Sequence, residues 1–308
     1  MSNTTPPRTN VYARVTDRII ADLEAGVRPW LKPWKGGSPE GRIAVPRRHN
    51  GTPYRGINIL LLWGAAMAKG YSSPLWMTFR QAGELKAHVR KGECGSLVVF
   101  ADRVAKTETN DQGEEVGREI AFMKGYTVFN VEQIEGLAAH YYAKIEPRGE
   151  PLKLIEAAEA FFAATGATFR YGGDNAYYAP GPDYIQLPPP EAFKDAESFA
   201  ATKGHELVHW SGHATRLARV LGKRFGDHAY AAEEFVGELG AAFLCADLGI
   251  TPEPRADHAS YLAHWLTILK ADKRAIFTAA AQAQRAVDFL HGLQPQTEAP
   301  QEAEQLAA

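Results

Sequence analysis

Apolar residues recur at helical spacing in some parts of the chain and at strand spacing in others. Helical periodicity predicts helices over residues 11–25, 56–69, 76–89, 152–166, 198–212 and 233–248, with one or two more in 259–293. Alternating or aromatic-rich stretches predict strands over 96–101 and 120–130 around a charged hairpin tip, and three short strands within 168–187. The expected fold class is α+β, in which a mixed N-terminal part precedes a mainly helical part with a small antiparallel sheet.

The 308 residues are enough for two domains, each with its own core. A stretch with prolines and a glycine predicts a linker over residues 136–151. The expected domains are therefore 1–135 and 152–293. Residues 294–308 are rich in Pro, Glu, Gln and Ala, and this composition predicts a disordered tail.

Charge divides the chain unevenly, although the net charge is only −2. Residues 1–100 hold 15 Lys and Arg against 6 Asp and Glu, whereas the remainder holds 19 against 30. Such asymmetry suggests that a basic N-terminal module meets polyanions and is attached to an acidic module that does not.

Cations and aromatic rings gather between residues 28 and 55, among prolines and glycines. Cations neutralise phosphates, and exposed rings stack on unpaired bases, so the cluster predicts binding to single-stranded nucleic acid. The candidate DNA-binding residues are Trp30, Lys32, Trp34, Lys35, Arg42, Arg47, Arg48, Tyr54 and Arg55. The alternative is a surface loop whose aromatic side chains fold inward, and for any single Trp that fate is the commoner one.

The segment from His205 to His209 reads His-Glu-Leu-Val-His on an expected helix. Residues four apart share a helix face, so His205 and His209 can aim at one point and bind a zinc ion. Glu206 can reach a water on that ion and act as the catalytic base, which is the arrangement of zinc peptidases. The alternative is an amphipathic helix with two histidines on its polar side.

A third ligand is expected from the second acidic helix, in which Glu234 and Glu238 lie four residues apart on one face. One of them can bind the metal while the other accepts a hydrogen bond from a ligand histidine. His213 and His228 are alternative ligands, but surface histidines are commoner than ligand histidines. The expected cofactor is one Zn²⁺ per chain, or another divalent ion such as Mn²⁺.

Two cysteines, Cys94 and Cys245, fall in different expected domains, which argues against a disulfide framework and favours a reducing cytoplasm. The longest apolar run, residues 59–68, is too short to cross a bilayer. We therefore expect a cytoplasmic protein without a membrane partner.

Two groups of motifs resemble one protein family. The N-terminal residues Asn10–Tyr12, Trp30, Trp34, Tyr54–Asn58 and Trp76–Phe79 resemble the single-stranded-DNA-binding domain of ArdC-type antirestriction proteins. The segment His205–His213, together with Tyr230–Glu238, is similar to their zincin-like metallopeptidase domain. The resemblance covers nearly the whole chain except the tail, and both parts occur in the same order.

The resemblance implies a plasmid-borne protein that protects incoming DNA from host restriction, with relatives fused to conjugative primases. It also implies metal ligation by two histidines and a glutamate. Carried over by position, His205 and His209 are the paired ligands and Glu206 is the catalytic residue. Glu234 is then the third ligand, and Glu238 is the acidic residue that orients a ligand histidine. An error of one helical turn would exchange the last two.

The sequence therefore leaves two main functions open. In one, a DNA-binding module carries a working peptidase, whose substrate could be a protein of the host restriction system. In the other, the protein only coats single-stranded DNA, and the metal stabilises the fold. A nuclease is the weakest reading, because nothing resembles the carboxylate cluster of a two-metal site.

Overall fold

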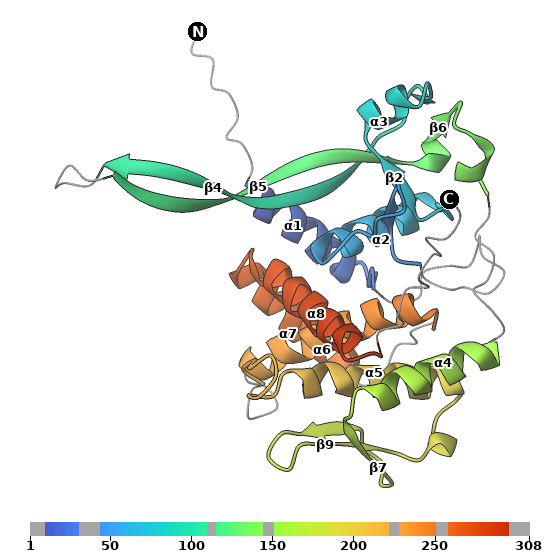
Figure 1. The fold of residues 1–308 in the computed structure, drawn as a ribbon, viewed down its shortest axis with the longest axis vertical. Coiled ribbons are helices and arrows are strands. Elements are labelled where there is room, and N and C mark those ends of the chain that lie inside the picture. Colours follow the sequence, from blue (N-terminus) through green and yellow to red (C-terminus); the bar gives the residue numbers. More distant parts are fainter. Residues whose placement is uncertain are drawn as a thin grey trace, which may run out of the picture.

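The structure of the chain is a computed structural model that describes residues 10–30, 44–109, 115–143, 151–221, 228–250 and 258–295. Helices and strands are mixed along the N-terminal half (Figure 1). They are α1 (Val11–Glu24), β1 (Arg47–Arg48), α2 (Ile57–Lys69), β2 (Leu75–Met77), α3 (Phe79–Glu84), β3 (His88–Val89), β4 (Ser96–Thr109), β5 (Glu115–Asn130) and β6 (Ile134–Glu135). The C-terminal half comprises α4 (Pro151–Ala164), β7 (Thr168–Tyr171), β8 (Tyr177–Ala179), β9 (Tyr184–Leu187), α5 (Ala196–Ser211), α6 (His228–Leu248), α7 (His258–Ala271) and α8 (Ala275–Gly292). The expected α+β class is confirmed.

The N-terminal sheet has the strand order β1-β2-β5-β4, and a long antiparallel hairpin of β4 and β5 dominates it. This hairpin projects beyond the helices (Figure 1). Its strands pair in register from Ser96↔Val128 to Thr109↔Glu115, further than the apolar pattern predicted. Backbone hydrogen bonds hold the ladder regardless of side chain, so pairing continues through the charged residues.

The edge of the sheet is partly covered by α2. The side-chain amide of Asn58 donates to the carbonyl of Val99 on β4 at 2.8 Å, and its oxygen accepts from the Val99 N–H at 2.7 Å. One asparagine thus substitutes for a neighbouring strand at this position of the edge.

The single helix expected over 76–89 is wrong. Trp76 and Met77 extend in β2 and pair with Asn130 and Phe129 of β5, and a short α3 begins only after Thr78. A capping box starts α3, because the Thr78 side chain accepts from the Gln81 N–H while the Gln81 side chain accepts from the Thr78 N–H.

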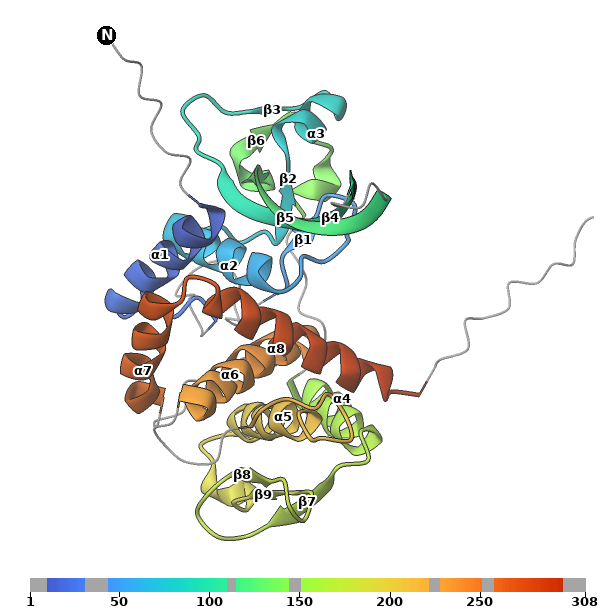
Figure 2. The same ribbon diagram turned by 90° about the vertical axis from the view of Figure 1, so that its left-hand side faces the viewer.

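The small C-terminal sheet has the order β7-β9-β8 and is mixed. Its β8–β9 pair is antiparallel as expected, whereas β7 and β9 are parallel. This corrects the expectation of a purely antiparallel sheet. The sheet lies beside α5 at the end of the molecule opposite the N-terminal sheet (Figure 2).

The largest hydrophobic cluster draws buried residues from both halves, and two smaller clusters lie between residues 54 and 141. Buried residues from both halves belong to this largest cluster, among them Val15, Ile19, Trp30, Leu60, Phe243, Trp265 and Val287. Polar contacts join the halves as well: the Thr16 hydroxyl donates to the carbonyl of Lys273 at 2.6 Å. The linker expected over 136–151 therefore separates two stretches of sequence that pack together.

Among the described residues, no helix combines the length and apolar character that a membrane span requires. The predicted tail, 294–308, lies outside the described residues beyond position 295.

Candidate metal centre

The helix α5 carries the His-Glu-x-x-His segment in the interior of the protein. Its N-terminus is capped by Asp195, whose carboxylate accepts from the backbone N–H of Ser198 at 2.7 Å. His205, Glu206 and His209 are only 4%, 3% and 8% exposed. This burial argues against the alternative of two histidines on a solvated polar face.

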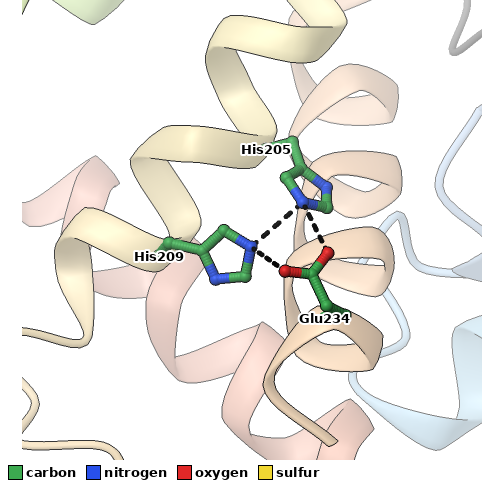
Figure 3. A group of neighbouring side chains, drawn as sticks. All are labelled: His205, His209 and Glu234. Atoms are coloured by element: carbon green, nitrogen blue, oxygen red, sulfur yellow. Dashed lines mark hydrogen bonds and ion pairs between the residues drawn. The ribbon is translucent and has the colours of Figure 1, made fainter. Parts of the chain in front are cut away.

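The two imidazoles converge. Their Nε2 atoms lie 3.0 Å apart, and their ring centroids 4.7 Å apart. The carboxylate of Glu234 on α6 completes the group, with Oε2 at 3.6 Å from Nε2 of His205 and Oε1 at 3.6 Å from Nε2 of His209 (Figure 3).

These distances match those between ligand atoms of a single cation. Bonds of 2.0–2.1 Å in a tetrahedral zinc site place neighbouring ligand atoms about 3.3 Å apart. One ligand atom from each of the three residues lies within 4.8 Å of the others, and this is the group capable of holding a metal among the described residues. The donor set of two imidazoles and one carboxylate also suits zinc or manganese.

Gly237 allows the two helices to approach at this point. A Cβ atom at Gly237 would lie 2.7 Å from Nε2 of His209 and 2.9 Å from Cε1 of His205. One turn further along α6, a Cβ at Gly240 would lie 2.7 Å from the Val208 side chain. The histidine pair and Val208 therefore fit against α6 because both of these positions are glycines, which have no side chain to clash with them.

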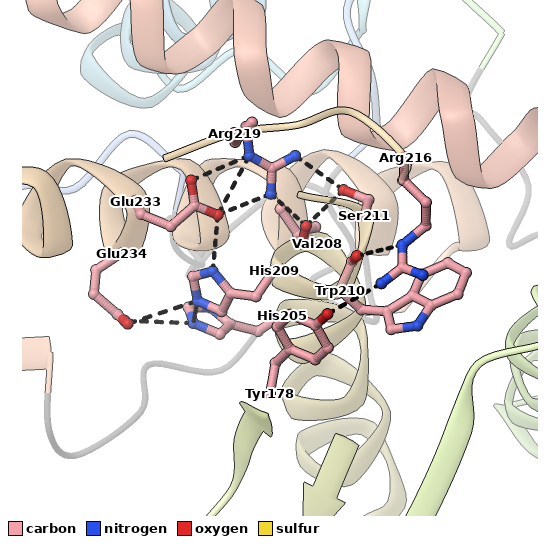
Figure 4. Close-up of polar contacts among 10 residues, drawn as sticks. All are labelled: Tyr178, His205, Val208, His209, Trp210, Ser211, Arg216, Arg219, Glu233 and Glu234. Carbon is pink, nitrogen blue, oxygen red and sulfur yellow. Dashed lines mark hydrogen bonds and ion pairs between the residues drawn. The ribbon is translucent and has the colours of Figure 1, made fainter. Parts of the chain in front are cut away.

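The residue next to the ligand glutamate orients His209. Oε1 of Glu233 lies 3.0 Å from Nδ1 of His209 (Figure 4). With Nδ1–H donating to this carboxylate, loss of the other ring proton would leave the lone pair of Nε2 for a metal. Arg219 in turn donates to both oxygens of Glu233, at 2.8 Å and 3.1 Å, and to the Ser211 hydroxyl at 3.0 Å.

Glu238 has a different partner from the one expected. Its Oε1 accepts a hydrogen bond from the indole N–H of Trp30 at 3.3 Å, and the supporting carboxylate on His209 is that of Glu233. Glu238 was expected as the support or as an alternative ligand; it is not in the group of convergent ligand atoms, and Glu233 lies against Nδ1 of His209 instead. Consecutive residues on α6 reach the α5 face, whereas Glu238 is turned toward the N-terminal segment.

Charges of opposite sign hold the centre in a polarised state. Burial alone would lower the pKa of His209, but the Glu233 hydrogen bond and the charges of Glu234, Glu233 and Glu206 raise it to about 9. Burial would raise the pKa of Glu234, but the His205 hydrogen bond, both imidazole charges and the Tyr230 hydroxyl lower it to about 2. A cation would replace the positive charge that His209 carries here.

An arginine anchors the end of α5 to the small sheet. Arg216 donates to both carboxylate oxygens of Asp183, at 2.6 Å and 3.0 Å, and to the Tyr178 hydroxyl at 3.1 Å. Its guanidinium also stacks 3.9 Å from the ring centroid of Trp210 (Figure 4). Tyr178 belongs to β8, an edge strand that packs against α5, so this anchor fixes the edge strand relative to the metal helix.

Trp30 does not belong to a DNA-binding surface. Its side chain is fully buried, packed against Phe235 and Trp265 at centroid distances of 5.5 Å and 6.2 Å. The expectation that this ring stacks on a base is wrong, because apolar burial against α6 and α7 removes it from solvent. This is the inward-folding alternative.

The other expected DNA-binding residues lie in several environments. Tyr54 is 8% exposed, with the guanidinium of Arg48 at 5.6 Å from its ring centroid. Arg48 itself is exposed, Arg47 donates to the carbonyl of Gly51, and Arg55 pairs with Asp288 of α8. Lys32, Trp34, Lys35 and Arg42 lie outside the described residues.

Of the two alternative histidines, His213 does not join the cluster of possible ligands found among the described residues. His213 pairs through Nδ1 with the hydroxyl of Thr215 at 2.8 Å. The side chain of His228 lies outside the described residues.

Sequence reasoning missed Glu233, Arg219, Tyr230 and Gly237. Glu233 directly precedes Glu234. This adjacent acidic pair could have indicated that one residue binds the metal and the other orients a ligand histidine. Arg219 lies in a basic stretch after α5, where its spacing does not distinguish it from its neighbours. Contact with another helix defines the role of Gly237, and no pattern within α6 encodes that contact.

Comparisons with known proteins address both halves. Residues 9–129 match a family model described as the N-terminal domain of anti-restriction factor ArdC, and residues 156–282 match a zincin-like metallopeptidase model. An uncharacterized protein of Sinorhizobium fredii is 44% identical over 93% of this chain and 93% of its own length. A DNA primase TraC of Escherichia coli is 37% identical over 91% of this chain, which spans only 27% of that primase.

Two solved structures are similar over nearly the whole fold. The metal-free crystal structure of antirestriction protein ArdC from plasmid R388 is 45% identical, with a TM-score of 0.77 over 92% of this chain and 97% of that one. The Mn(II)-bound structure of the same protein is 44% identical, with a TM-score of 0.73 over 92% of this chain and 98% of that one.

Proposed function

Because the chain belongs to the ArdC family of antirestriction proteins, we propose that it binds single-stranded DNA, protects incoming plasmid DNA from host restriction and carries a metal-dependent peptidase centre. The zincin-like domain and the Mn(II)-bound relative indicate a divalent metal. In our proposal His205, His209 and Glu234 hold one such ion per chain, either zinc or manganese.

One observation carries the peptidase part: three convergent ligand atoms lie within 4.8 Å of one another, and a buried Glu206 follows the first ligand. When bound, a divalent cation polarises a carbonyl and lowers the pKa of a coordinated water toward ~7. In our proposal Glu206 takes a proton from the attacking water and returns it to the leaving amine. Glu233 keeps His209 in the tautomer whose Nε2 faces the centre.

The substrate proposed for this centre is an extended peptide. The β8 strand is at the edge of its sheet and packs against α5, so its free side can accept a further strand by backbone hydrogen bonds. A protein of the host restriction system is the proposed source of such a peptide.

Replacing Glu206 with Gln tests the chemistry without emptying the centre. We expect peptide cleavage to fall at least about a hundredfold, because general-base catalysis contributes 10²–10⁴-fold, while bound metal stays at one ion per chain. His205→Ala should instead lose the metal. Turnover that persists in Glu206→Gln would remove this residue from the mechanism.

The second candidate is a protein that only coats single-stranded DNA, with a structural metal. The basic N-terminal stretch and the match to the ArdC N-terminal domain favour DNA binding independently of the metal centre. Protection of transferred DNA against restriction separates the two functions. If folded Glu206→Gln protects as well as the unaltered protein, coating alone is sufficient.

DNA binding has its own test. Phosphate contacts make affinity fall steeply with salt, and stacking requires unpaired bases, so single strands should bind more tightly than duplex of the same length. Fluorescence anisotropy of labelled oligonucleotides between 50 and 200 mM salt measures both effects. Equal affinity for the two forms would contradict the proposal.

A further inference from the structure

Two aromatic rings and a lysine project from the outer face of the β4–β5 hairpin. Phe100 and Tyr126 are 46% and 41% exposed, and Lys124 is exposed beside them. Exposed aromatic rings that occur singly need no explanation, but neighbouring rings with a cation form a surface that can select a ligand. We call Phe100, Lys124 and Tyr126 the hairpin platform.

The register of the hairpin places these three side chains on one face. Phe100 pairs with Lys124, and Val98 pairs with Tyr126, and directly opposed residues of antiparallel strands share a face. The residues that alternate with them, Val99 and Met123, pack into or against the main core. The core therefore fixes which way the platform points.

Contacts within the platform order its members. The Phe100 and Tyr126 rings meet edge to face, with centroids 6.4 Å apart and an interplanar angle of 78°. The ammonium group of Lys124 lies 5.5 Å from the Tyr126 centroid. The two rings contact each other, and the paired strands hold their backbone in place. Less side-chain entropy is therefore lost when a ligand stacks on them.

The same sheet face is buried beyond the platform. Arg48 of β1 pairs with Trp76 of β2, and Trp76 pairs with Asn130 of β5, which has the same facing as Tyr126 four residues earlier. Arg48 is exposed and lies over the ring of Tyr54. Val98, Val128, Trp76 and Asn130 on this face are at most 6% exposed, so its accessible part is the platform, and Arg48 is exposed only beyond these buried residues.

We infer that the hairpin platform is a stacking site for unpaired nucleotides of single-stranded DNA, with Lys124 contacting a backbone phosphate. The inference rests on the proposed DNA-binding function and names where it occurs. Rings accept the faces of unpaired bases and cations neutralise phosphates, and this combination suits a single strand better than a duplex, whose base faces are covered. It also replaces the buried Trp30 as the source of stacking.

Oligo(dT) labelled with a fluorophore is the probe, and the full chain is titrated against it at constant salt. Stacking is worth enough that Phe100→Leu/Tyr126→Leu should weaken binding roughly tenfold or more, although leucine preserves apolar bulk. The matched control is Phe79→Leu, since Phe79 is 65% exposed but belongs to α3 and contacts Phe129. This control should bind as the unaltered protein does.

Two further variants keep the inference testable if the double variant is poorly folded. Tyr126→Trp should retain affinity, because it keeps a stacking ring. Lys124→Gln should reduce the slope of log affinity against log salt by about 0.7, the loss of one phosphate contact on a single strand.

The outcomes distinguish this inference from the function on which it rests. If the unaltered protein fails to bind oligo(dT), the proposed DNA-binding function fails. If it binds but the double leucine variant binds equally well, only the platform is overturned. An unchanged DNA affinity together with a changed oligomeric state would assign these rings to self-association and also overturn the inference.

Discussion

The indole N–H of Trp30 donates to the Glu238 carboxylate at 3.3 Å, which ties the N-terminal segment to the helix that carries the metal ligand Glu234 in our proposal. Trp30 is fully buried, and Glu238 is 4% exposed. Trp30, which the sequence predicted to bind DNA, and Glu238, which it predicted to support the metal site, are thus in contact in the interior. Their contact adds a buried polar link to the hydrophobic cluster that both halves share.

Replacing Trp30 with Ala should destabilise the protein by about 3–5 kcal/mol, because it removes a large buried side chain from the shared core. Urea denaturation monitored by circular dichroism measures the change. Trp30→Phe should cost less, since it keeps a ring but loses the hydrogen bond to Glu238. A large loss of DNA affinity at an unchanged unfolding midpoint would restore Trp30 to the DNA-binding surface.

Gly237→Ala should abolish or strongly weaken metal binding. Alanine ordinarily stabilises a helix relative to glycine by roughly 0.5–1 kcal/mol, but here its methyl group would lie 2.7 Å from Nε2 of His209. We expect the metal dissociation constant to rise more than about tenfold, because ligand geometry changes. Competition with a chelating dye measures it.

Gly204→Ala is the control for that substitution. Gly204 is also helical, and its nearest neighbour would be Leu244 at 3.5 Å, an ordinary contact. Metal affinity should therefore be unchanged and stability equal or slightly higher. Similar losses of metal in both variants would show that any methyl group between α5 and α6 disturbs the centre.

Glu233→Gln should weaken metal binding about 10- to 100-fold, as expected for a residue that orients a ligand histidine. Glu238→Gln is the matched comparison, because Glu238 is another buried glutamate of α6 and accepts a hydrogen bond from Trp30. Its metal affinity should be unaffected. The reverse order of effects would return the supporting role to Glu238.

Metal affinity should rise with pH. In the metal-free protein the pKa of His209 is raised to about 9, so a proton occupies this ligand at neutral pH and must leave when metal binds. The apparent association constant should increase about tenfold per pH unit between pH 6.5 and 8. Calorimetry in buffers of different ionisation enthalpy counts the released protons.

The metal-free protein should show the opposite dependence in its stability. A pKa raised in the folded state means that the His209 contribution is fully present below the unfolded value of 6.5 and is lost as pH rises through about 9. Thermal unfolding in a chelator should give a lower midpoint at pH 9 than at pH 6.5. A midpoint that increases over this interval would contradict a charged His209.

The sequence determined the features that depend on local spacing. Helical periodicity located α1, α2, α4 and α5 within one or two residues, and the interval of four residues placed His205 and His209 on one face. These features are encoded locally because a helix fixes the relative direction of residues three and four apart.

The tertiary structure alone decided which side chains meet across elements. Glu233 and not Glu238 supports His209, Trp30 enters the core, β7 pairs in parallel, and Gly237 admits two imidazoles. Each of these depends on the rotation and separation of two elements distant in sequence. Packing of the whole core sets this rotation and separation, and they cannot be predicted from the residue spacing within one element.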